Sequence, residues 1–371
     1  MILPAAERPK VSALLEELAR SVEELLLSGL TTASEATRKT LDVSFREASR
    51  MRLLRLGSTL RVANEELGRY TRNDPEFSAK RLSFFLNRTW LLSHGLHRAL
   101  ARNDEAEFDR LLWTPASEPI ASLELVTVGV VKKVAARAFC AFDFRLRTLS
   151  ASGSIPAGAR LAWSCVFPIK PEAAIPAEGY LHLPQKQKFK AAELLESKTI
   201  HIEHATVALD GFGGGRISLT EESKLTLGAK FTDWQRFQLW DAAAALARLA
   251  GHQAGPLDLD VELQEEVVLD PWTVEEPFEK DQQWLYPITA GPLAFEAVSA
   301  KGVEGEALGK RMLEFKKKKK VRPPLFGLMH YERCRMVLQP LTVFADEGPV
   351  HLMLSDQNID RKALLQALKF T

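Results

Sequence analysis

The sequence predicts an α+β protein in which an N-terminal antiparallel helical bundle precedes a strand-rich, barrel- or sandwich-like region with a few helices. Three observations predict it. Apolar residues recur at three- and four-residue steps up to about residue 112. Beyond Trp113 and a proline-bearing segment, the chain is rich in β-branched and aromatic residues. Ala, Gly, Ser and Pro turns separate these later runs. The predicted domains are 1–115, 116–230 and 231–371.

The helical part contains signals for several helices. A stripe of apolar residues from Val11 to Leu26 predicts the first helix, which Gly29 is suited to end. Thr32 with Glu35 three residues later is a capping-box pattern, and the helix it opens is expected to stop at Gly57. Asp74 followed by Pro75 predicts a further N-terminus. Amphipathic helices with short connections pack as an antiparallel bundle.

The middle of the chain contains strand patterns. The runs are LELVTVGVVKKV, RAFCAFDFRLRTL, ARLAWSCVFPI, KTIHIEHATVAL and RISLTEESKLTLG. In the second run, alternate residues from Phe139 to Arg147 share one face, as in a half-buried strand. These strands predict a meander, a sandwich or a small barrel, with an OB-type barrel as one candidate for domain 116–230.

The last third predicts a mixed α+β domain. The run TDWQRFQLWDAAAALARLAG predicts a helix ending at Gly251, and the alternating LDLDVELQEEVVL predicts a strand. Shorter strands follow, and a helix from about Asp360 to Phe370 closes the chain.

Composition limits the classes of protein to consider. Apolar residues make up 46% and charged residues 26% of 371 residues, which is typical of a globular protein. No apolar run resembles a secretory signal or a membrane span. Three widely separated cysteines, Cys140, Cys165 and Cys334, include no CxxC pair and favour neither disulfides nor a zinc site. We therefore expect a cytoplasmic protein without cofactor or metal.

The net charge of +1 hides two oppositely charged segments. Residues 258–281 contain ten acidic residues and one lysine, whereas residues 301–335 contain eleven Lys or Arg and four Glu. The segments can neutralise each other within one folded domain, or the second can provide a basic surface for a polyanion.

The most conspicuous basic feature is the run Lys316, Lys317, Lys318, Lys319 and Lys320, with Arg322 close behind. Such a run prefers solvent, so it is either an exposed surface without a ligand or a contact for phosphates of nucleic acid. Phosphate contacts give affinity but carry no sequence information.

A second basic cluster consists of Lys186, Lys188 and Lys190, with Phe189 between them. Aromatic residues beside cations are typical of single-strand binders, but a single phenylalanine favours the other interpretation, in which Phe189 anchors this loop to the core. Similarly, Arg46, Arg50, Arg52, Arg55 and Arg61 form a basic helical stripe in sequence, and the nearby Glu47, Glu65 and Glu66 can pair with them.

No catalytic residues are predicted. The segment DGFGGGR lacks the GxxxxGK[ST] pattern of a P-loop and is expected to be a hairpin turn. Glu314 and Lys316 have the Glu-x-Lys form of metal-dependent nucleases. That acidic-x-Lys pattern occurs four times in the chain, which is close to chance for its composition.

The segments GVVKKVAARAFCAFDFRLRTL and GYLHLPQKQKFKAAELLESKTIHI resemble uncharacterised bacterial proteins encoded beside MoxR-type AAA ATPases, von Willebrand A-domain proteins and SWIM zinc-finger proteins. The resemblance covers about residues 120–210. It implies an accessory role in a multi-protein system, with an AAA ATPase or a von Willebrand A-domain protein as partner, and it transfers no catalytic residue.

These observations leave three functional hypotheses. The first is a non-catalytic bacterial adaptor that binds protein partners. The second is a nucleic-acid-binding protein that uses Lys316–Lys320 and Lys186–Lys190. The third is a metal-dependent nuclease that uses Glu314.

Overall fold

In a computed structural model of the chain, two compact units are present: residues 1–115 with 254–258, and residues 116–253 with 259–371. The structure describes residues 6–30, 35–75, 77–112, 117–135, 139–169, 175–209, 214–237, 264–280, 283–301, 303–317, 322–332 and 335–355, together with residues 4, 243, 246, 247 and 257. One unit is helical and the other is mainly strands, so the predicted α+β class with a helical N-terminal part is confirmed.

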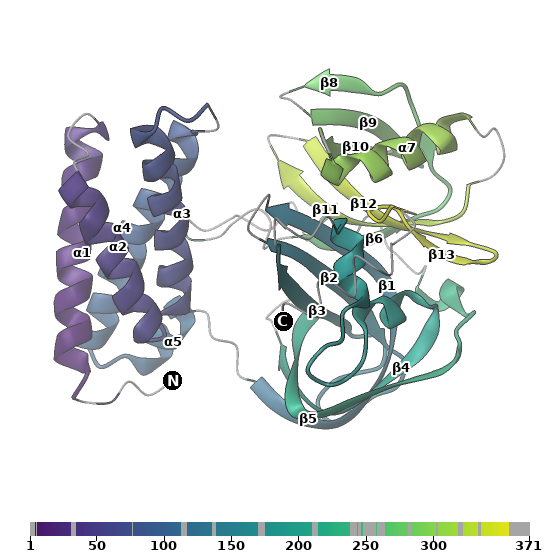
Figure 1. Ribbon diagram of the computed structural model, residues 1–371, viewed down its shortest axis with the longest axis horizontal. Helices are drawn as coiled ribbons and strands as arrows, with labels where there is room; N and C mark the ends of the chain where they lie inside the picture. Colours follow the sequence, from purple (N-terminus) through teal and green to yellow (C-terminus); the bar gives the residue numbers. More distant parts are fainter. Residues whose placement is uncertain are drawn as a thin grey trace. The chain divides into compact units, whose positions relative to one another are not determined.

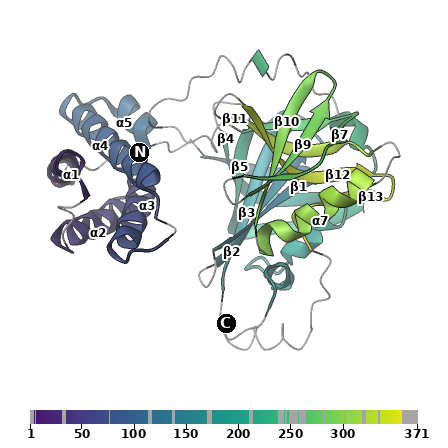
Figure 2. The same ribbon diagram turned by 90° about the horizontal axis from the view of Figure 1, so that it is seen from above.

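The helical unit is an up-and-down bundle (Figure 1). Its helices are α1 (Arg8–Ser28), α2 (Glu35–Arg50), α3 (Leu54–Thr71), α4 (Ala79–Ala101) and the short α5 (Glu105–Leu112). The view from above shows α1 to α4 surrounding a common centre, with α5 beside α4 (Figure 2). Leu15, Leu41, Leu60 and Leu92, fully or almost fully buried, represent its leucine-rich core. No described helix is long and apolar enough to cross a membrane.

The predicted helix from Thr32 to Leu56 is wrong at its C-terminal end, because α2 stops at Arg50 and α3 begins at Leu54. Arg52 has a φ of 58°, the Leu53 amide donates to Ala48 O, and the Arg52 amide donates to Ser49 O. These bonds form a Schellman turn, which usually has glycine where Arg52 lies. Gly57 instead lies within α3. Thr32 is outside the described residues.

The start of α4 also differs from the prediction. Its N-cap is Ser78, whose Oγ accepts a hydrogen bond from the Arg81 amide, so the helix begins four residues after Pro75. A serine hydroxyl satisfies a free amide of the first turn, which a proline at the first position does not do.

The strand unit begins with a closed five-stranded barrel in the order β1-β2-β3-β5-β4. Its strands are β1 (Ser117–Ala135), β2 (Phe139–Thr148), β3 (Arg160–Pro168), β4 (Lys198–Leu209) and β5 (Gly214–Lys230). All neighbouring pairs are antiparallel except β3 and β5, an arrangement of the OB type. The short helices η2 (Ala177–His182) and η3 (Ala191–Leu195) connect β3 to β4 and pack Tyr180 and Leu194 into the barrel core.

The rest of this unit is an eight-stranded sheet. Its path is β6 (Glu265–Leu269), β11 (Leu325–Glu332), β12 (Arg335–Ala345), β10 (Leu293–Ala300), β9 (Gln283–Ala290) and β7 (Thr273–Val274). The strand β13 (Gly348–His351) pairs with β12, and β8 (Phe278–Lys280) pairs with β9. Helix α7 (Val303–Lys317) lies on this sheet (Figure 2).

The barrel and the second sheet share β1. Val126 and Val128 of β1 belong to the apolar core of the second sheet. At Gly129 a Cβ atom would lie 2.7 Å from Cε1 of Phe326 in β11, so the glycine permits this close approach. The barrel ends with β5 at Lys230.

Two predicted helices lie largely or wholly outside the described residues. Within the predicted helix of residues 232–251, η4 (Trp234–Phe237) is a single 3-10 turn. The predicted closing helix from Asp360 to Phe370 is outside the described part of the chain.

Candidate nucleic-acid interface

The Lys186–Lys190 cluster is a tight turn on the barrel. The Gln185 amide donates to Phe189 O at 2.7 Å, and the Lys188 amide donates to Gln185 O at 2.9 Å, with Lys188 at a φ of 66°. Gln187 Nε2 donates to Thr220 O of β5 and holds the turn to the barrel. Lys186, Lys188 and Lys190 are exposed. This turn therefore presents three cations to solvent from a fixed backbone.

Phe189 does not belong to a binding surface. Its side chain is 4% exposed, and its ring centroid lies 5.6 Å from that of Trp163 in the barrel core. Stacking on a nucleic-acid base needs an accessible ring face. The assignment of Phe189 to a polyanion site is therefore wrong, and the alternative interpretation of Phe189 as an anchor is confirmed.

Arg322 is also part of the fold. Its guanidinium lies over the ring of Trp272 at 5.5 Å from the centroid and donates to Phe315 O and Trp272 O. Since Phe315 is in the last turn of α7, Arg322 satisfies a helix-terminal carbonyl. These contacts engage part of the guanidinium, and the contact of Arg322 with a polyanion stays a prediction.

The lysine run begins in α7. Lys316 forms an ion pair with Glu276, Lys317 is exposed, and Lys318, Lys319 and Lys320 are outside the described residues. Lys301 likewise pairs with Glu279. Both ion pairs join the basic segment 301–335 to the acidic segment 258–281. The prediction that these two segments neutralise each other within one domain is confirmed for these pairs.

The nuclease pattern does not form a site. Glu314 pairs with Arg311 at 3.4 Å, and Lys316 pairs with Glu276. Residues two apart on a helix point in different directions, so the two side chains do not converge. Among the described residues, no group of three His, Cys, Asp or Glu side chains could hold a metal ion.

The outer face of β2 and β3 is where OB-type barrels usually bind oligonucleotides or oligosaccharides. Three arginines lie here, Arg145, Arg147 and Arg160, but two of them are engaged. Arg147 forms an ion pair with Glu266, and Arg160 Nη1 lies 3.2 Å from Glu265 Oε1, both at the start of β6. Phe142, Phe144 and Trp163 of these strands point into the core, and Phe139, on the outer face, is half-buried. This face therefore has two engaged arginines and no fully exposed aromatic ring among its described residues.

Asp143 further reduces the positive charge of the β2–β3 face. Its carboxylate accepts a hydrogen bond from Lys133 Nζ at 2.7 Å. Burial favours the neutral acid, but hydrogen bonds from Lys133 and Ser164 outweigh burial and lower the pKa of Asp143. Asp143 is therefore charged at neutral pH.

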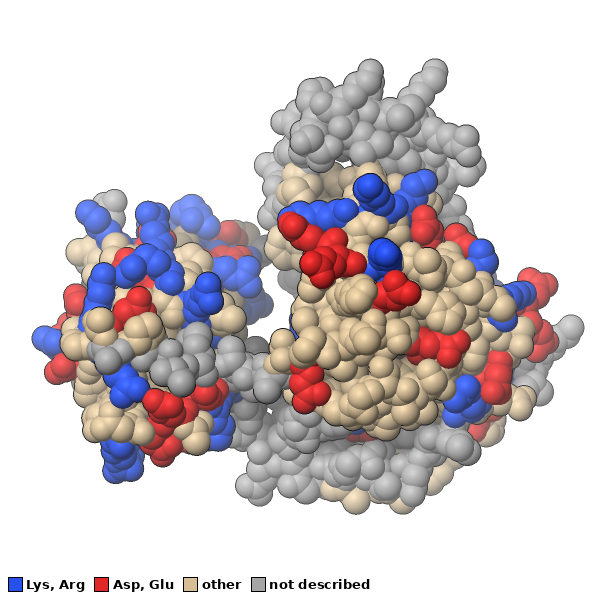
Figure 3. All heavy atoms as spheres, turned by 90° about the horizontal axis from the view of Figure 1, so that it is seen from below, with Lys and Arg blue, Asp and Glu red and all other residues tan. Residues whose placement is uncertain are grey.

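The largest excess of exposed cations among the described elements is in the helical unit. Residues 35–101 contain 13 Lys or Arg and only 7 Asp or Glu. In the view of Figure 3, Lys and Arg side chains form a band along one side of this unit, while Asp and Glu side chains lie mainly on the other side. We define the α2–α3 basic surface as the exposed residues Arg38, Lys39, Arg46, Arg50, Arg52, Arg61 and Arg72.

The helical period explains this surface. On α2, Arg38, Lys39, Arg46 and Arg50 fall within an arc of about 120°, opposite the buried Leu41 and Ala48. On α3, Arg61 shares the solvent-facing arc with exposed Ser58 and Glu65. Arg72 follows α3, and Arg52 lies in the turn between the two helices. The amphipathic period that buries the leucines thus brings the cations together on the outside.

Carboxylates neutralise part of the surface. Arg46 pairs with Asp42 and Arg50 pairs with Glu47, each at 2.8 Å. The hydrogen bond from Arg50 lowers the pKa of Glu47. Within the described residues, Lys39, Arg52, Arg61 and Arg72 form no ion pair. These four cations are therefore available to an anionic ligand.

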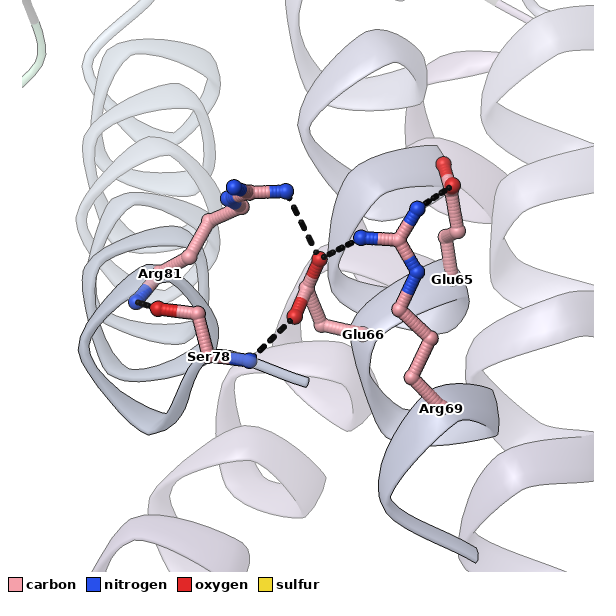
Figure 4. Close-up of polar contacts among 5 residues, drawn as sticks. All are labelled: Glu65, Glu66, Arg69, Ser78 and Arg81. Atoms are coloured by element: carbon pink, nitrogen blue, oxygen red, sulfur yellow. Dashed lines mark hydrogen bonds and ion pairs between the residues drawn. The ribbon is translucent and has the colours of Figure 1, made fainter. Parts of the chain in front are cut away.

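Other arginines of the bundle are structural (Figure 4). Glu66 is 1% exposed, and its carboxylate accepts from Arg69 Nη1 at 2.8 Å, Arg81 Nη1 at 3.0 Å and the Ser78 amide at 2.9 Å. Arg69 also donates to Glu65 at 2.8 Å. This cluster joins the end of α3 to the start of α4. Arg69 and Arg81 are thereby bound to carboxylates and are not counted in the basic surface.

Part of this surface is visible in the sequence. Of the helical stripe that it suggests, Arg46, Arg50, Arg52 and Arg61 belong to the surface, whereas Arg55 donates to Leu257 O at 2.9 Å. Arg38, Lys39 and Arg72 were missed, although the first two have the same helical spacing on α2. The predicted pairing of this region with Glu47 is confirmed for Arg50, but Glu65 and Glu66 pair with Arg69 and Arg81 instead.

Comparisons with known proteins identify no family. No family model and no curated protein matches the chain. Among solved structures, a murine DNA-binding protein bound to double-stranded DNA is similar at 9% identity, covering 60% of this chain and 93% of that chain, with a TM-score of 0.27. The HINa domain of Ifi202 in complex with double-stranded DNA is 10% identical over 61% of this chain and 91% of that chain, with a TM-score of 0.24. Likenesses at these TM-scores carry no argument about the function of this chain.

Proposed function

We propose that the protein binds nucleic acid through the phosphate backbone and that the α2–α3 basic surface is the contact. The observation that carries the proposal is the group of exposed cations Lys39, Arg52, Arg61 and Arg72, which form no ion pair with the described residues, beside the partly paired Arg46 and Arg50. Most of these cations are arginines, whose planar guanidinium matches phosphate oxygens with two parallel hydrogen bonds.

The distribution of charge favours a polyanion over a small anion. The cations extend from Arg38 at the start of α2 to Arg52 after its end, a helix of 16 residues or about 24 Å. A phosphate chain can contact several such cations at once, and each contact releases bound counterions. A nucleic acid therefore gains affinity that a single phosphate group does not.

The barrel adds weaker support. OB-type barrels bind oligonucleotides or oligosaccharides in many proteins, but a shared fold does not determine function. In this chain, Glu265 and Glu266 occupy two arginines of the relevant face. We therefore assign the main contact to the helical unit, and the exposed turn at Lys186, Lys188 and Lys190 is the alternative contact to be tested against it.

The test is binding of labelled nucleic acid by the full chain at several salt concentrations. The surface variant carries Arg52→Gln, Arg61→Gln and Arg72→Gln, none of which breaks an ion pair among the described residues. The matched control carries Arg20→Gln, Arg98→Gln and Arg102→Gln, which removes the same charge from exposed positions on α1, on α4 and just after α4. A third variant carries Lys186→Gln, Lys188→Gln and Lys190→Gln.

We expect the logarithm of the binding constant to fall linearly with the logarithm of salt concentration, with a slope smaller by about 1 for each phosphate contact removed. The surface variant should bind more weakly and show a smaller salt-dependence slope. The matched control should keep both the affinity and the slope of the unchanged protein. Equal losses in both variants, or a loss confined to the turn variant, would contradict the assigned contact. Absence of binding at low salt would contradict the function and leave the adaptor role as the remaining prediction from the sequence.

A further inference from the structure

Resting on the proposed function, we infer that the α2–α3 basic surface takes the backbone of double-stranded nucleic acid in preference to single strands, and does so without reading sequence. The surface combines a row of cations on α2 and a neighbouring cation on α3 with a lack of fully exposed aromatic rings.

The cations follow two antiparallel helices. Arg38, Lys39, Arg46 and Arg50 lie on α2, Arg61 lies on α3, and Arg52 and Arg72 come directly after α2 and α3. The opposite sides of both helices are fixed in the core by residues such as Leu41 and Leu60. Positions four apart on one helix are about 6 Å apart along its axis, and packed helices lie about 8–10 Å apart. The cations thus form a rigid row along α2, with Arg61 on the neighbouring helix. A duplex presents two strands of phosphates with a charge every 1.7 Å or so of its axis, which can engage the row and Arg61 together.

Single strands gain less than a duplex from this surface. Proteins that bind single strands without sequence preference stack the bases on aromatic side chains, which contribute about 1–3 kcal/mol for each base. The aromatic residues of α2 and α3 are Phe45 and Tyr70. Both are partly buried against the helical core, and Tyr70 packs on Phe77 at 5.3 Å between centroids. Neither ring is fully exposed, so a single strand gains mainly phosphate contacts here.

The surface has few groups that read base edges. Asn and Gln recognise adenine through two hydrogen bonds in the major groove. The only Asn or Gln in α2, α3 and their connecting turn is Asn64, and its Oδ1 is buried. Arginine can pair with guanine in the same groove, so a preference for one duplex sequence is the result that tests this point. Contacts of the surface cations with phosphates do not distinguish sequences.

The experiment is a competition assay on the full chain at low salt. A labelled duplex of 20 base pairs is displaced by an unlabelled duplex of unrelated sequence, by each of its separated strands, and by heparin at the same charge concentration. We expect the unrelated duplex to compete within about twofold of the original, and each strand to compete at least about tenfold less well.

The outcomes separate this inference from the proposed function. Single strands that compete as well as the duplex, or a strong preference for one duplex sequence, would overturn the inference while nucleic-acid binding stands. Heparin that competes better than the duplex would overturn it in favour of a general polyanion site. If no labelled duplex or strand binds at all, the proposed function itself fails. The Arg52, Arg61 and Arg72 variant serves as the second measurement, since its loss of affinity must be larger for the duplex than for the strands.

Discussion

The carboxylate of Glu66, near the end of α3, lies 3.0 Å from Nη1 of Arg81, in the first turn of α4. The same carboxylate accepts from Arg69 and from the Ser78 amide, so a single buried side chain fixes how α4 leaves α3. The positions of two surface cations depend on this junction, because α3 carries Arg61 and is followed by Arg72.

Replacing Glu66 with Gln is therefore expected to destabilise the helical unit. The amide cannot satisfy two guanidinium groups and a backbone amide as a carboxylate does, and unmet buried hydrogen bonds cost about 1–3 kcal/mol. Urea unfolding followed by circular dichroism measures the loss. Glu65→Gln is the control, because Glu65 is 57% exposed and pairs only at the surface, which predicts a change within about 0.5 kcal/mol. Equal effects of the two substitutions would show that Glu66 has no special structural role.

Gly129→Ala tests the close approach of the barrel to the second sheet. The new Cβ would lie 2.7 Å from Cε1 of Phe326 and 3.3 Å from Cβ of Leu341. Overpacking of this kind costs about 1–3 kcal/mol. The same substitution in a Phe326→Leu background should be less destabilising, because the ring that it meets is gone. Additive effects in this double-mutant cycle would contradict the proposed contact.

Lys132 and Glu178 form a buried ion pair between β1 and η2, with 2.9 Å between Nζ and Oε1. Glu178 also accepts a hydrogen bond from the Ser355 amide. Lys132→Met leaves a buried carboxylate without its cation, which typically costs about 3–5 kcal/mol. The double variant Lys132→Met with Glu178→Gln should recover part of this loss. If the double variant is instead destabilised by the sum of the single effects, the two side chains are not coupled.

His351 predicts a dependence of stability on pH. Burial lowers the pKa of His351 to about 4, while its Nδ1 lies 3.0 Å from Oγ1 of Thr342. In the unfolded chain the pKa is about 6.5, so the unfolded state binds the proton first. The stabilisation is complete above about pH 6.5 and is lost as pH falls towards 4, with a loss of about 1–2 kcal/mol by pH 5.

The measurement for His351 is the free energy of unfolding at pH 7 and pH 5. The difference between these two values should be smaller in His351→Gln than in the unchanged protein, because glutamine does not titrate. Identical differences in both proteins would mean that other groups account for the whole acid sensitivity.

Local sequence patterns were sufficient for the helices of the bundle and most strands, but they missed α7 and some helix ends. Apolar periodicity and alternation involve residues only a few positions apart along the chain, so they predicted the bundle and the existence of β2. The prediction that β2 is half-buried is wrong for residues 140–144, which are buried on both faces. The end of α2 was missed because Arg52 has the left-handed conformation for which glycine is the usual signal. Closure of the barrel depends on pairing β1 with β4 and β3 with β5, which are far apart in sequence. The OB arrangement could therefore be only one candidate among several.

For the candidate site too, local patterns were visible in the sequence, whereas contacts between distant residues were not. The alternation of Lys and Phe at residues 186–190 predicted correctly that Phe189 could be an anchor. Composition alone suggested that Lys316 and Arg322 are both available to a ligand. It could not show that residues from a distant segment, Glu276 and Trp272, contact them. The arginines of α2 and α3 were visible as a helical stripe. Which of them are free depends on contacts across helices, such as that of Glu66 with Arg81.

The most direct test of the basic surface is chemical modification of arginine by phenylglyoxal, read by peptide mass spectrometry with and without a saturating duplex. The account predicts that the duplex protects Arg52, Arg61 and Arg72 from modification and leaves Arg20, Arg98 and Arg102 as reactive as in the free protein. Protection of the second group, or unchanged reactivity of the first group in a complex that forms, would contradict it.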